Sequence, residues 1–103
     1  MLITRPTGCY ALVREDHEWR RLHAVAPEVD TVSTVGSGDV LLAAFLAARV
    51  AGRSALEALR AGVGAGAAST LEIGAGRFDP RNATRLAGAV EVRELEPVAS
   101  ADL

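Results

Sequence analysis

The spacing of hydrophobic residues changes along this chain from short runs to a helical pattern. The short runs cover Leu2–Thr4, Cys9–Val13 and Trp19–Val25, and Pro6 and Gly8 separate the first two. Short apolar runs bounded by turn-forming residues are typical of strands. We therefore predict two strands joined by a tight turn, followed by a third strand.

A long helix is predicted after a linker at Ala26–Asp30, where Pro27 cannot donate a hydrogen bond to a strand ladder. From Gly38 to Val50, apolar residues fill most of the helical circumference. This pattern indicates a helix that is buried on more than one side. Gly52 is expected to end it, because glycine is the usual residue just after a helix.

A second helix is predicted to begin at Ser54 and to run to about Thr70. Ser54 and Glu57 have the spacing of a capping box, in which the serine hydroxyl caps the amide of the glutamate. Glycine inside a helix lowers its intrinsic stability, so it needs a packing or functional reason. We expect another backbone or a ligand to approach this helix closely at Gly62, Gly64 and Gly66.

The last elements are a short helix and a strand. Asp79 is a good N-cap and Pro80 suits the first helical position, so a third helix is expected from there to about Gly88. Val90–Leu95 alternates well enough for a strand. The expected fold class is α/β, with short strands, then two or three helices packed on a partial sheet, then a final strand. One incomplete domain is predicted over residues 1–95, followed by a flexible tail over residues 96–103.

Composition limits the chain to one small domain with a thin core. Half of the 103 residues are apolar, but most of these are small and only one Trp, one Tyr and two Phe supply bulk. Trp19 and Phe45 are therefore expected to pack in the core. The single cysteine, Cys9, cannot form an internal disulfide, which favours a packing role in a reducing cytoplasm.

Charge and hydropathy exclude several classes of function. Eleven basic and thirteen acidic residues give a net charge of −2 with no long run of either sign, so no nucleic-acid partner is expected. No window is long and apolar enough to span a membrane, and the first residues lack the order of a secretory signal. A soluble, cytoplasmic protein is expected. His17 and His23 stand without a second cluster of ligands, so we expect them at the surface or an edge.

The segment Thr34–Asp39, with the sequence TVGSGD, is the strongest chemical signal in the chain. Two glycines ahead of a helix leave backbone N–H groups open to an anion, and an aspartate follows in the first helical turn. Taken alone, the same letters describe an ordinary turn from a strand into a helix. The glycine pattern in Gly62–Ala67 superficially fits a dinucleotide fingerprint, but it continues a helix instead of following a strand, so we discount it.

The Thr34–Asp39 segment is one of several motifs that occur in a fixed order along the chain. Thr34–Asp39 and its apolar helix are followed by a set of short motifs, and together they resemble the C-terminal part of the ribokinase-like PfkB family of sugar kinases. The similarity is greatest to the 1-phosphofructokinase and tagatose-6-phosphate kinase branch, and it extends from about Leu2 to about Leu95. The motifs after the helix are Gly52-Arg53-Ser54, Glu57-Ala58-Leu59, Ala65-Gly66-Ala67-Ala68-Ser69-Thr70-Leu71 and Gly74-Ala75-Gly76.

The resemblance implies ATP-dependent transfer of a phosphoryl group to a sugar hydroxyl, with Mg²⁺ as a cofactor. It places Asp39 as the catalytic base. The family's anion hole corresponds to the backbone N–H groups of Gly36, Ser37 and Gly38. Such donors would stabilise the charge of the transferring phosphoryl group, and Asp39 would accept the proton of the attacking hydroxyl. The resemblance also implies that Val63 and Ser69 lie beside the nucleotide base.

The chain departs from the family pattern at two places. Ser33 stands where relatives usually carry Asp or Asn. In a loop that lies near the ATP phosphates in relatives, Pro6 and Cys9 replace two glycines, or Gly8 is displaced by one position. Pro6 removes an N–H and Cys9 adds a side chain, which weakens the expected phosphate contact from this loop. Some relatives bind a monovalent cation through carbonyl groups, and the sequence does not decide whether this chain does. The corresponding positions are Ser33, Val35, Ser69, Glu72 and Gly74.

Three interpretations follow from the sequence. The family's sugar-contacting residues, lid strands and acidic magnesium-associated motif all lie N-terminal to the matched stretch. The chain is then a kinase segment, incomplete alone, that works with a missing N-terminal half or as a homo-oligomer. Alternatively it is a non-catalytic nucleotide-binding module, or a degenerate kinase remnant. The sequence does not identify the sugar.

Overall fold

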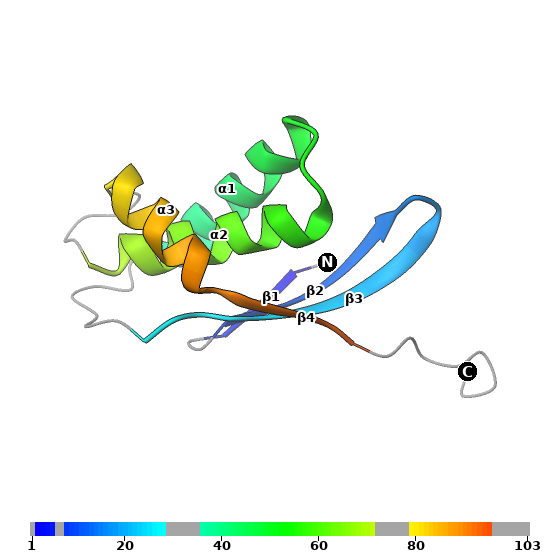
Figure 1. The fold of residues 1–103 in the computed structure, drawn as a ribbon, viewed down its shortest axis with the longest axis horizontal. Helices are drawn as coiled ribbons and strands as arrows, with labels where there is room; N and C mark the ends of the chain where they lie inside the picture. The colour runs from blue at the N-terminus through cyan, green and yellow to red at the C-terminus, as the bar shows by residue number, and fades with distance from the viewer. Residues whose placement is uncertain (1, 6–7, 29–35, 72–78, 96–103) are drawn as a thin grey trace.

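The computed structural model describes residues 2–5, 8–28, 36–71 and 79–95 and arranges them in two layers (Figure 1). One layer is a sheet and the other is a row of helices, which confirms the α/β class and the order of strands, helices and a final strand. The predicted tail, residues 96–103, lies outside the described residues. The strands are β1 (Leu2–Arg5), β2 (Gly8–Glu15), β3 (Glu18–Val25) and β4 (Glu91–Glu94), and the helices are α1 (Ser37–Val50), α2 (Ala55–Ser69) and α3 (Pro80–Ala89).

The sheet has the order β1-β2-β3-β4, and each neighbouring pair is antiparallel. Its last strand returns from α3 to pair with β3, so the two ends of the described chain form the two edges of the sheet. β2 and β3 are longer than the apolar runs predicted for them and meet in a two-residue hairpin turn. Asp16 and His17 both have positive φ angles there, 53° and 68°, as a hairpin turn of the right twist requires.

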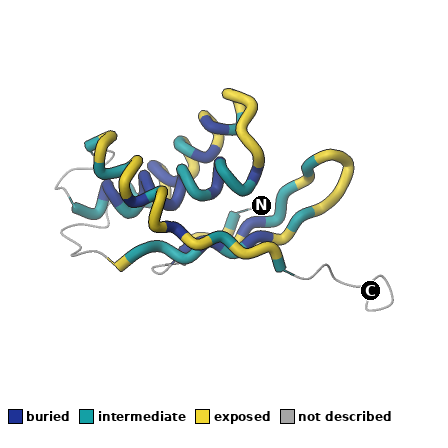
Figure 2. The backbone as a smooth tube through the Cα atoms, viewed as in Figure 1, coloured by how far each residue is buried: buried dark blue, intermediate teal, exposed yellow. Residues whose placement is uncertain are grey.

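One face of the sheet forms the core together with α2. Cys9 and Ala11 of β2 and Leu22 and Ala24 of β3 point to this face and are buried, as the alternation along a strand dictates. Helix α2 covers them with small residues and with Leu59, which is fully buried. The buried positions gather between the two layers (Figure 2). Small side chains let the helix lie close to the sheet, so the core is thin.

Glycines bring the three helices into close contact. A Cβ atom added to Gly62 would lie 2.8 Å from the carbonyl oxygen of Leu41 in α1. One added to Gly64 would lie 2.6 Å from the Cα atom of Ala87 in α3. Both distances are shorter than real Cβ atoms show, so these positions have no room for a side chain. The expectation that another backbone approaches the glycines of α2 is confirmed.

The predicted helix starts are confirmed by their caps. The Ser54 hydroxyl oxygen accepts a hydrogen bond of 3.2 Å from the Glu57 amide, and the Asp79 carboxylate accepts one of 2.9 Å from the Arg81 amide. These bonds satisfy amides that have no partner within the helix. The Glu57 carboxylate pairs with Arg53 at 3.2 Å, so within the described residues only the serine half of the capping box forms.

Two predictions about burial are wrong. Helix α1 is buried on one side only: Leu41 and Phe45 face α2, whereas an opposite stripe is exposed. Trp19 is 62% exposed instead of lying in the core. Side chains alternate along β3, so Trp19 points away from the face of Leu22 and Ala24 that the helices cover. Phe45 and Cys9 are buried as expected. No helix among the described residues has the length and apolarity needed to cross a membrane.

Candidate functional site

Helix α1 begins directly after Gly36. This residue is the N-cap, with φ 80° and ψ 0°, a left-handed conformation that glycine adopts without the penalty of a Cβ. Its carbonyl accepts the first helical hydrogen bond, from the Val40 amide at 3.0 Å. As a glycine, Gly36 has no side chain to cap this end, unlike the N-cap residues Ser54 and Asp79 of α2 and α3. The first amides of an α-helix have no acceptor within the helix and carry a partial positive charge.

The first turn of α1 is open to solvent. Gly38 and Asp39 are both exposed, and a Cβ atom added to Gly38 would meet nothing within 4 Å. An anion can therefore approach the helix start beside the Asp39 carboxylate. The TVGSGD motif predicted an anion site at this helix start, which stays a prediction, and Thr34 and Val35 lie outside the described residues.

The C-terminal half of α2 lies against the same end of α1. A Cβ atom added to Gly66 would lie 3.2 Å from the carbonyl oxygen of Ser37, which marks a close approach of the two backbones. Ser69, one turn further along α2, donates a hydrogen bond of 2.7 Å from its hydroxyl to the Gly66 carbonyl. The structure thus brings Ser69 to the end of the molecule that carries Gly36 and Asp39.

The side chains of Val63 and Ser69 are buried. Val63 is 3% exposed and belongs to the core cluster with Leu41 and Phe45, and Ser69 is 1% exposed. Neither side chain offers much surface to a nucleotide base in this structure. The more accessible part of this region is the end of α2, where Thr70 and Leu71 are half-buried.

Of the two residues that replace glycines of the family's phosphate loop, the structure explains one, Cys9. Cys9 lies within β2, not in a loop, and its fully buried side chain points into the core. Burial raises the pKa of the Cys9 thiol, so the sulfur stays protonated at neutral pH. The expectation that Cys9 adds a side chain to a phosphate-facing loop is therefore wrong. Pro6 and most of the candidate cation positions (Ser33, Val35, Glu72 and Gly74) lie outside the described residues.

Gly8, next to Cys9, is needed by the sheet. Its φ of 156° and its position against β3 leave no space for a side chain, since a Cβ atom would lie 2.0 Å from the Ala24 carbonyl oxygen.

Within the described residues, no group of three or more His, Cys, Asp or Glu side chains is placed to hold a metal ion.

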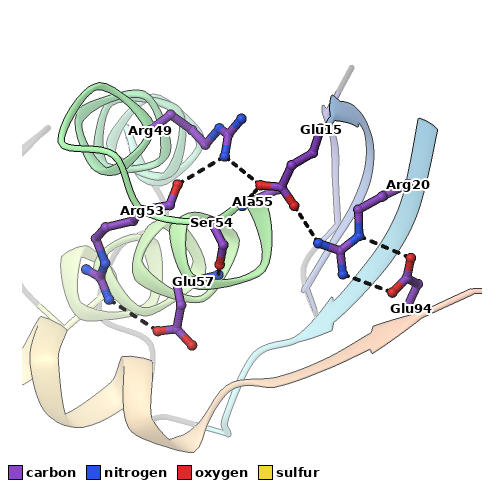
Figure 3. Close-up of polar contacts among 8 residues, drawn as sticks. All are labelled: Glu15, Arg20, Arg49, Arg53, Ser54, Ala55, Glu57 and Glu94. Atoms are coloured by element: carbon purple, nitrogen blue, oxygen red, sulfur yellow. Dashed lines mark hydrogen bonds and ion pairs between the residues drawn. The ribbon is translucent and has the colours of Figure 1, made fainter. Parts of the chain in front are cut away.

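A polar network at the other end of α1 was not predicted from the sequence (Figure 3). The Glu15 carboxylate, from the end of β2, accepts hydrogen bonds from the Ala55 amide at 2.6 Å, Arg49 at 2.7 Å and Arg20 at 2.5 Å. Arg20 also donates to both carboxylate oxygens of Glu94, at 3.1 and 2.9 Å. The network therefore connects the hairpin, the end of α1, the start of α2 and β4.

These contacts shift the acidity of Glu15. The backbone hydrogen bond from Ala55 and the side-chain bond from Arg20 lower its pKa below the usual value of 4.5, despite partial burial. A carboxylate at the first amide of α2 also complements the positive end of that helix. The network sets how the helices sit on the hairpin and lies at the opposite end of α1 from Gly36. In the sequence, Glu15 just before the turn is the one sign of this network. Its partners Arg49 and Ala55 are distant along the chain, so the network could not be predicted.

Comparison with protein families gives a match over most of the chain. A sequence model of the pfkB family of carbohydrate kinases matches residues 6–82. Among curated proteins, the acarbose 7(IV)-phosphotransferase of an Actinoplanes strain is 43% identical over 60 residues, which are 58% of this chain and 20% of that protein. The chain thus spans about a fifth of the length of this relative.

Solved structures share the fold. A Staphylococcus aureus protein assigned as a phosphofructokinase superposes with a TM-score of 0.80 at 23% identity, over 92% of this chain and 29% of that one. Phosphofructokinase-2 from Escherichia coli, in a complex with potassium, gives a TM-score of 0.70 at 28% identity, over 82% of this chain and 26% of that one. The described layers therefore match a part of these kinases, and less than a third of their length.

Proposed function

Since this chain belongs to the pfkB family of carbohydrate kinases, we propose that it forms the C-terminal, nucleotide-binding and catalytic part of an ATP-dependent sugar kinase. The observation that carries the proposal is the solvent-exposed first turn of α1, in which Gly38 and Asp39 are both exposed. We assign it to the 1-phosphofructokinase and tagatose-6-phosphate kinase branch on the motifs of Thr34–Asp39 and Ala65–Leu71.

In the proposed reaction, the residues at the start of α1 divide two tasks. The Asp39 carboxylate accepts the proton of a sugar hydroxyl while the sugar oxygen bonds to the γ-phosphorus of ATP. The bond from that phosphorus to the oxygen bridging the β-phosphate breaks, and ADP leaves. The backbone N–H groups of Gly36, Ser37 and Gly38 face the charge on the transferring group, where preorganised donors are most effective.

Asp39 needs only modest basicity for this role. In a loose phosphoryl-transfer transition state the hydroxyl proton is given up late, so the position of the carboxylate matters more than its pKa. The exposure of Asp39 supports the proposal, because a sugar must reach the carboxylate from outside the described part of the chain.

We place the nucleotide base near the end of α2, beside Val63 and Ser69. The close approach of Gly66 to Ser37 supports this placement, because it brings the end of α2 next to the proposed phosphate site. Since both side chains are buried, the exposed contact would come from the residues that follow Ser69.

The described residues do not by themselves make a site for Mg²⁺. Among the described residues, Asp39 is the one carboxylate in the first turn of α1, and they contain no group of three acidic, His or Cys side chains suited to a metal. Magnesium ions are commonly held by one or two carboxylates together with substrate phosphates. No step of the proposed reaction is therefore assigned to this ion.

Nucleotide binding without transfer is the second candidate function. The chain spans about a fifth to three tenths of the relatives it matches, and we propose that the sugar contacts lie outside this stretch. A chain that kept the anion site alone would bind ATP or ADP and transfer nothing. A remnant that had lost the site would bind neither nucleotide.

The proposal is tested by titrating ATP with Mg²⁺ into the purified chain by calorimetry, with circular dichroism on the same sample. Gly38→Ala is the decisive variant, because the added methyl group meets no protein atom yet would stand at the proposed phosphate site. We expect wild type to bind and Gly38→Ala to bind at least about tenfold more weakly, a loss of about 1.4 kcal/mol. Equal affinity of the two folded proteins would refute the anion site.

The matched variant for the base is Asp39→Asn. It should keep nucleotide binding in the same titration, because the asparagine retains the shape of the side chain. Where transfer to a sugar is measurable, the rate should fall by about a hundredfold or more, as expected when a general base is removed. An unchanged rate would exclude Asp39 as the base.

A further inference from the structure

One face of α1 is apolar and uncovered. Leu42, Leu46 and Val50 are 45%, 52% and 89% exposed. Their spacing of four residues places them in one row along the helix. We call this row the outer α1 face. Helix α1 has only two charged residues, Asp39 and Arg49, so no charge interrupts the row.

An uncovered sheet edge lies on the same side of the molecule. β1 pairs only with β2 among the described strands, so the backbone groups along its other edge have no partner there. Leu2 of β1 packs against the core cluster that includes Leu41 and Phe45 of α1. Figure 1 shows α1 behind α2 and β1 at the rear of the sheet, with α3 and β4 in front. The outer α1 face and the free edge of β1 therefore border one side.

The opposite side also ends in a free strand edge, that of β4, but its described residues form no exposed apolar row. There, Leu86 of α3 and Val90 are each 3% exposed, and the exposed positions of α3 and β4 are mostly polar or charged. Glu91, Arg93 and Glu94 are exposed along β4, and charges on an edge strand discourage further pairing. An exposed apolar row beside a free strand edge is instead a usual mark of an interaction surface.

We propose that the outer α1 face and the free edge of β1 dock the remaining part of a pfkB-family kinase, the part that would carry the sugar site. The inference rests on the proposed function. Length identifies the occupant: this chain accounts for 20% of the acarbose 7(IV)-phosphotransferase and 29% of the Staphylococcus aureus structure. More than two thirds of such a kinase must therefore contact this part through some surface. Large apolar side chains are also exposed on the sheet face turned away from the helices, at Ile3, Tyr10 and Trp19, but the α1 side combines an apolar row with a free strand edge.

The position of Asp39 explains why this surface would serve the reaction. Asp39 lies one helical turn before Leu42 and thus at the beginning of the outer α1 face. A partner that covered Leu42 and Leu46 would stand next to the Asp39 carboxylate. The docked part would then present its sugar hydroxyl to Asp39, while a strand of that part could pair with β1 and extend the sheet. Docking therefore completes the site.

The test is co-expression of the tagged chain with the Actinoplanes acarbose 7(IV)-phosphotransferase from which the stretch matching this chain has been deleted. The measured quantity is the amount of that shortened kinase recovered with the tag in a one-to-one complex. Leu46→Glu is compared with wild type, and Trp19→Glu is the control. Both side chains are largely exposed, at 52% and 62%, but only Leu46 lies on the outer α1 face.

We expect wild type and Trp19→Glu to recover similar amounts, and Leu46→Glu at least about tenfold less, which corresponds to 1.4 kcal/mol. Circular dichroism of each chain alone checks that all three fold. No complex with wild type, or equal recovery with Leu46→Glu, overturns the proposal. So does a discrete wild-type homodimer, seen by sedimentation, that Leu46→Glu converts to a monomer, because a second copy would then be the occupant.

The docking proposal and the proposed function can be refuted independently of each other. A wild-type chain that binds ATP in the calorimeter but recovers no shortened kinase would retain the proposed function and lose the docking surface. A chain that recovers the shortened kinase but binds no ATP would show the reverse.

Discussion

The two sides of the helical layer end differently. At α3 and β4 the layer closes with Leu86 and Val90 buried, and charged residues line the edge strand. At α1 and β1 it ends in an exposed apolar row and a strand edge with no partner among the described strands. Helix α2 lies between them and is buried along most of its length. This contrast indicates that the stability of this part comes from α2 and its neighbours, whereas the α1 side leaves apolar surface uncovered.

The largest expected effect comes from breaking the closed side. In Gly64→Ala the added methyl group would lie 2.6 Å from backbone atoms of Ala87, which cannot move as a side-chain end could. We expect the free energy of unfolding to fall by about 2 to 3 kcal/mol, the range for overpacking a close contact. Denaturant unfolding followed by circular dichroism measures it. Gly88→Ala in α3, where a Cβ meets nothing within 4 Å, is the control and should not destabilise.

The next effect concerns the Glu15 network, which joins the two sides. Glu15 contacts Arg49 of α1 and, through Arg20, Glu94 of β4. Glu15→Gln keeps the shape but removes the charge from three hydrogen bonds. We expect a loss of about 1 to 2 kcal/mol in unfolding free energy, discounted for the partial exposure of the arginines. The neighbouring Glu18→Gln should change stability little. Equal effects of the two substitutions would mean that the network does not couple the sides.

The pH dependence of the unfolding free energy is a second test of the Glu15 network. Because the hydrogen bonds from Ala55 and Arg20 lower the folded pKa of Glu15 below 4.5, the unfolded chain takes up its proton first as pH falls. The stabilisation is therefore fully present above pH 4.5 and is lost as the pH falls through the folded pKa. The denaturant midpoint of wild type should drop across this range, and Glu15→Gln should drop less. Parallel curves would assign the acid sensitivity to other groups.

The smallest effect is expected on the open side. Leu46 is 52% exposed, so Leu46→Ala in the isolated chain should change the unfolding free energy by less than about 0.5 kcal/mol. Phe45→Ala, one position away but 7% exposed and in the core, should destabilise several times more, because it leaves a cavity. Thermal unfolding of the pair measures the contrast between the two faces of α1. Similar losses would show that the outer α1 face is already covered in the isolated chain.

Local signals in the sequence explain the parts that were predicted correctly. The caps at Ser54 and Asp79, the short strands and the turn at Gly36 all depend on residues within a few positions of one another. The glycines of α2 also carried information, because glycine inside a helix needs a close neighbour. Their partners in α1 and α3 were nevertheless not evident from the sequence.

The wrong or missing predictions concern which face of an element is buried and which elements, distant along the chain, contact one another. The apolar circumference of α1 indicated burial on more than one side, yet in this structure only the face toward α2 is covered. Trp19 was expected in the core because of its size, but alternation along β3 places it on the sheet face turned away from the helices. The apolar run predicted Cys9 at the start of a strand, whereas the family resemblance placed it in a phosphate-facing loop, and the structure has it inside β2. Glu15 was missed because its partners come from α1, α2 and β3.

The elements, their caps, the family and the chemistry expected at the start of α1 could be predicted from local residues, because they depend on short-range backbone preferences and on an ordered set of motifs. The folded arrangement was needed to show that α2 is the centre of the helical layer and that Glu15 and Arg20 link the hairpin to α1, α2 and β4. It also placed Asp39 at the beginning of the outer α1 face. These arrangements depend on contacts between residues far apart in the chain, and local patterns do not encode which of those contacts form.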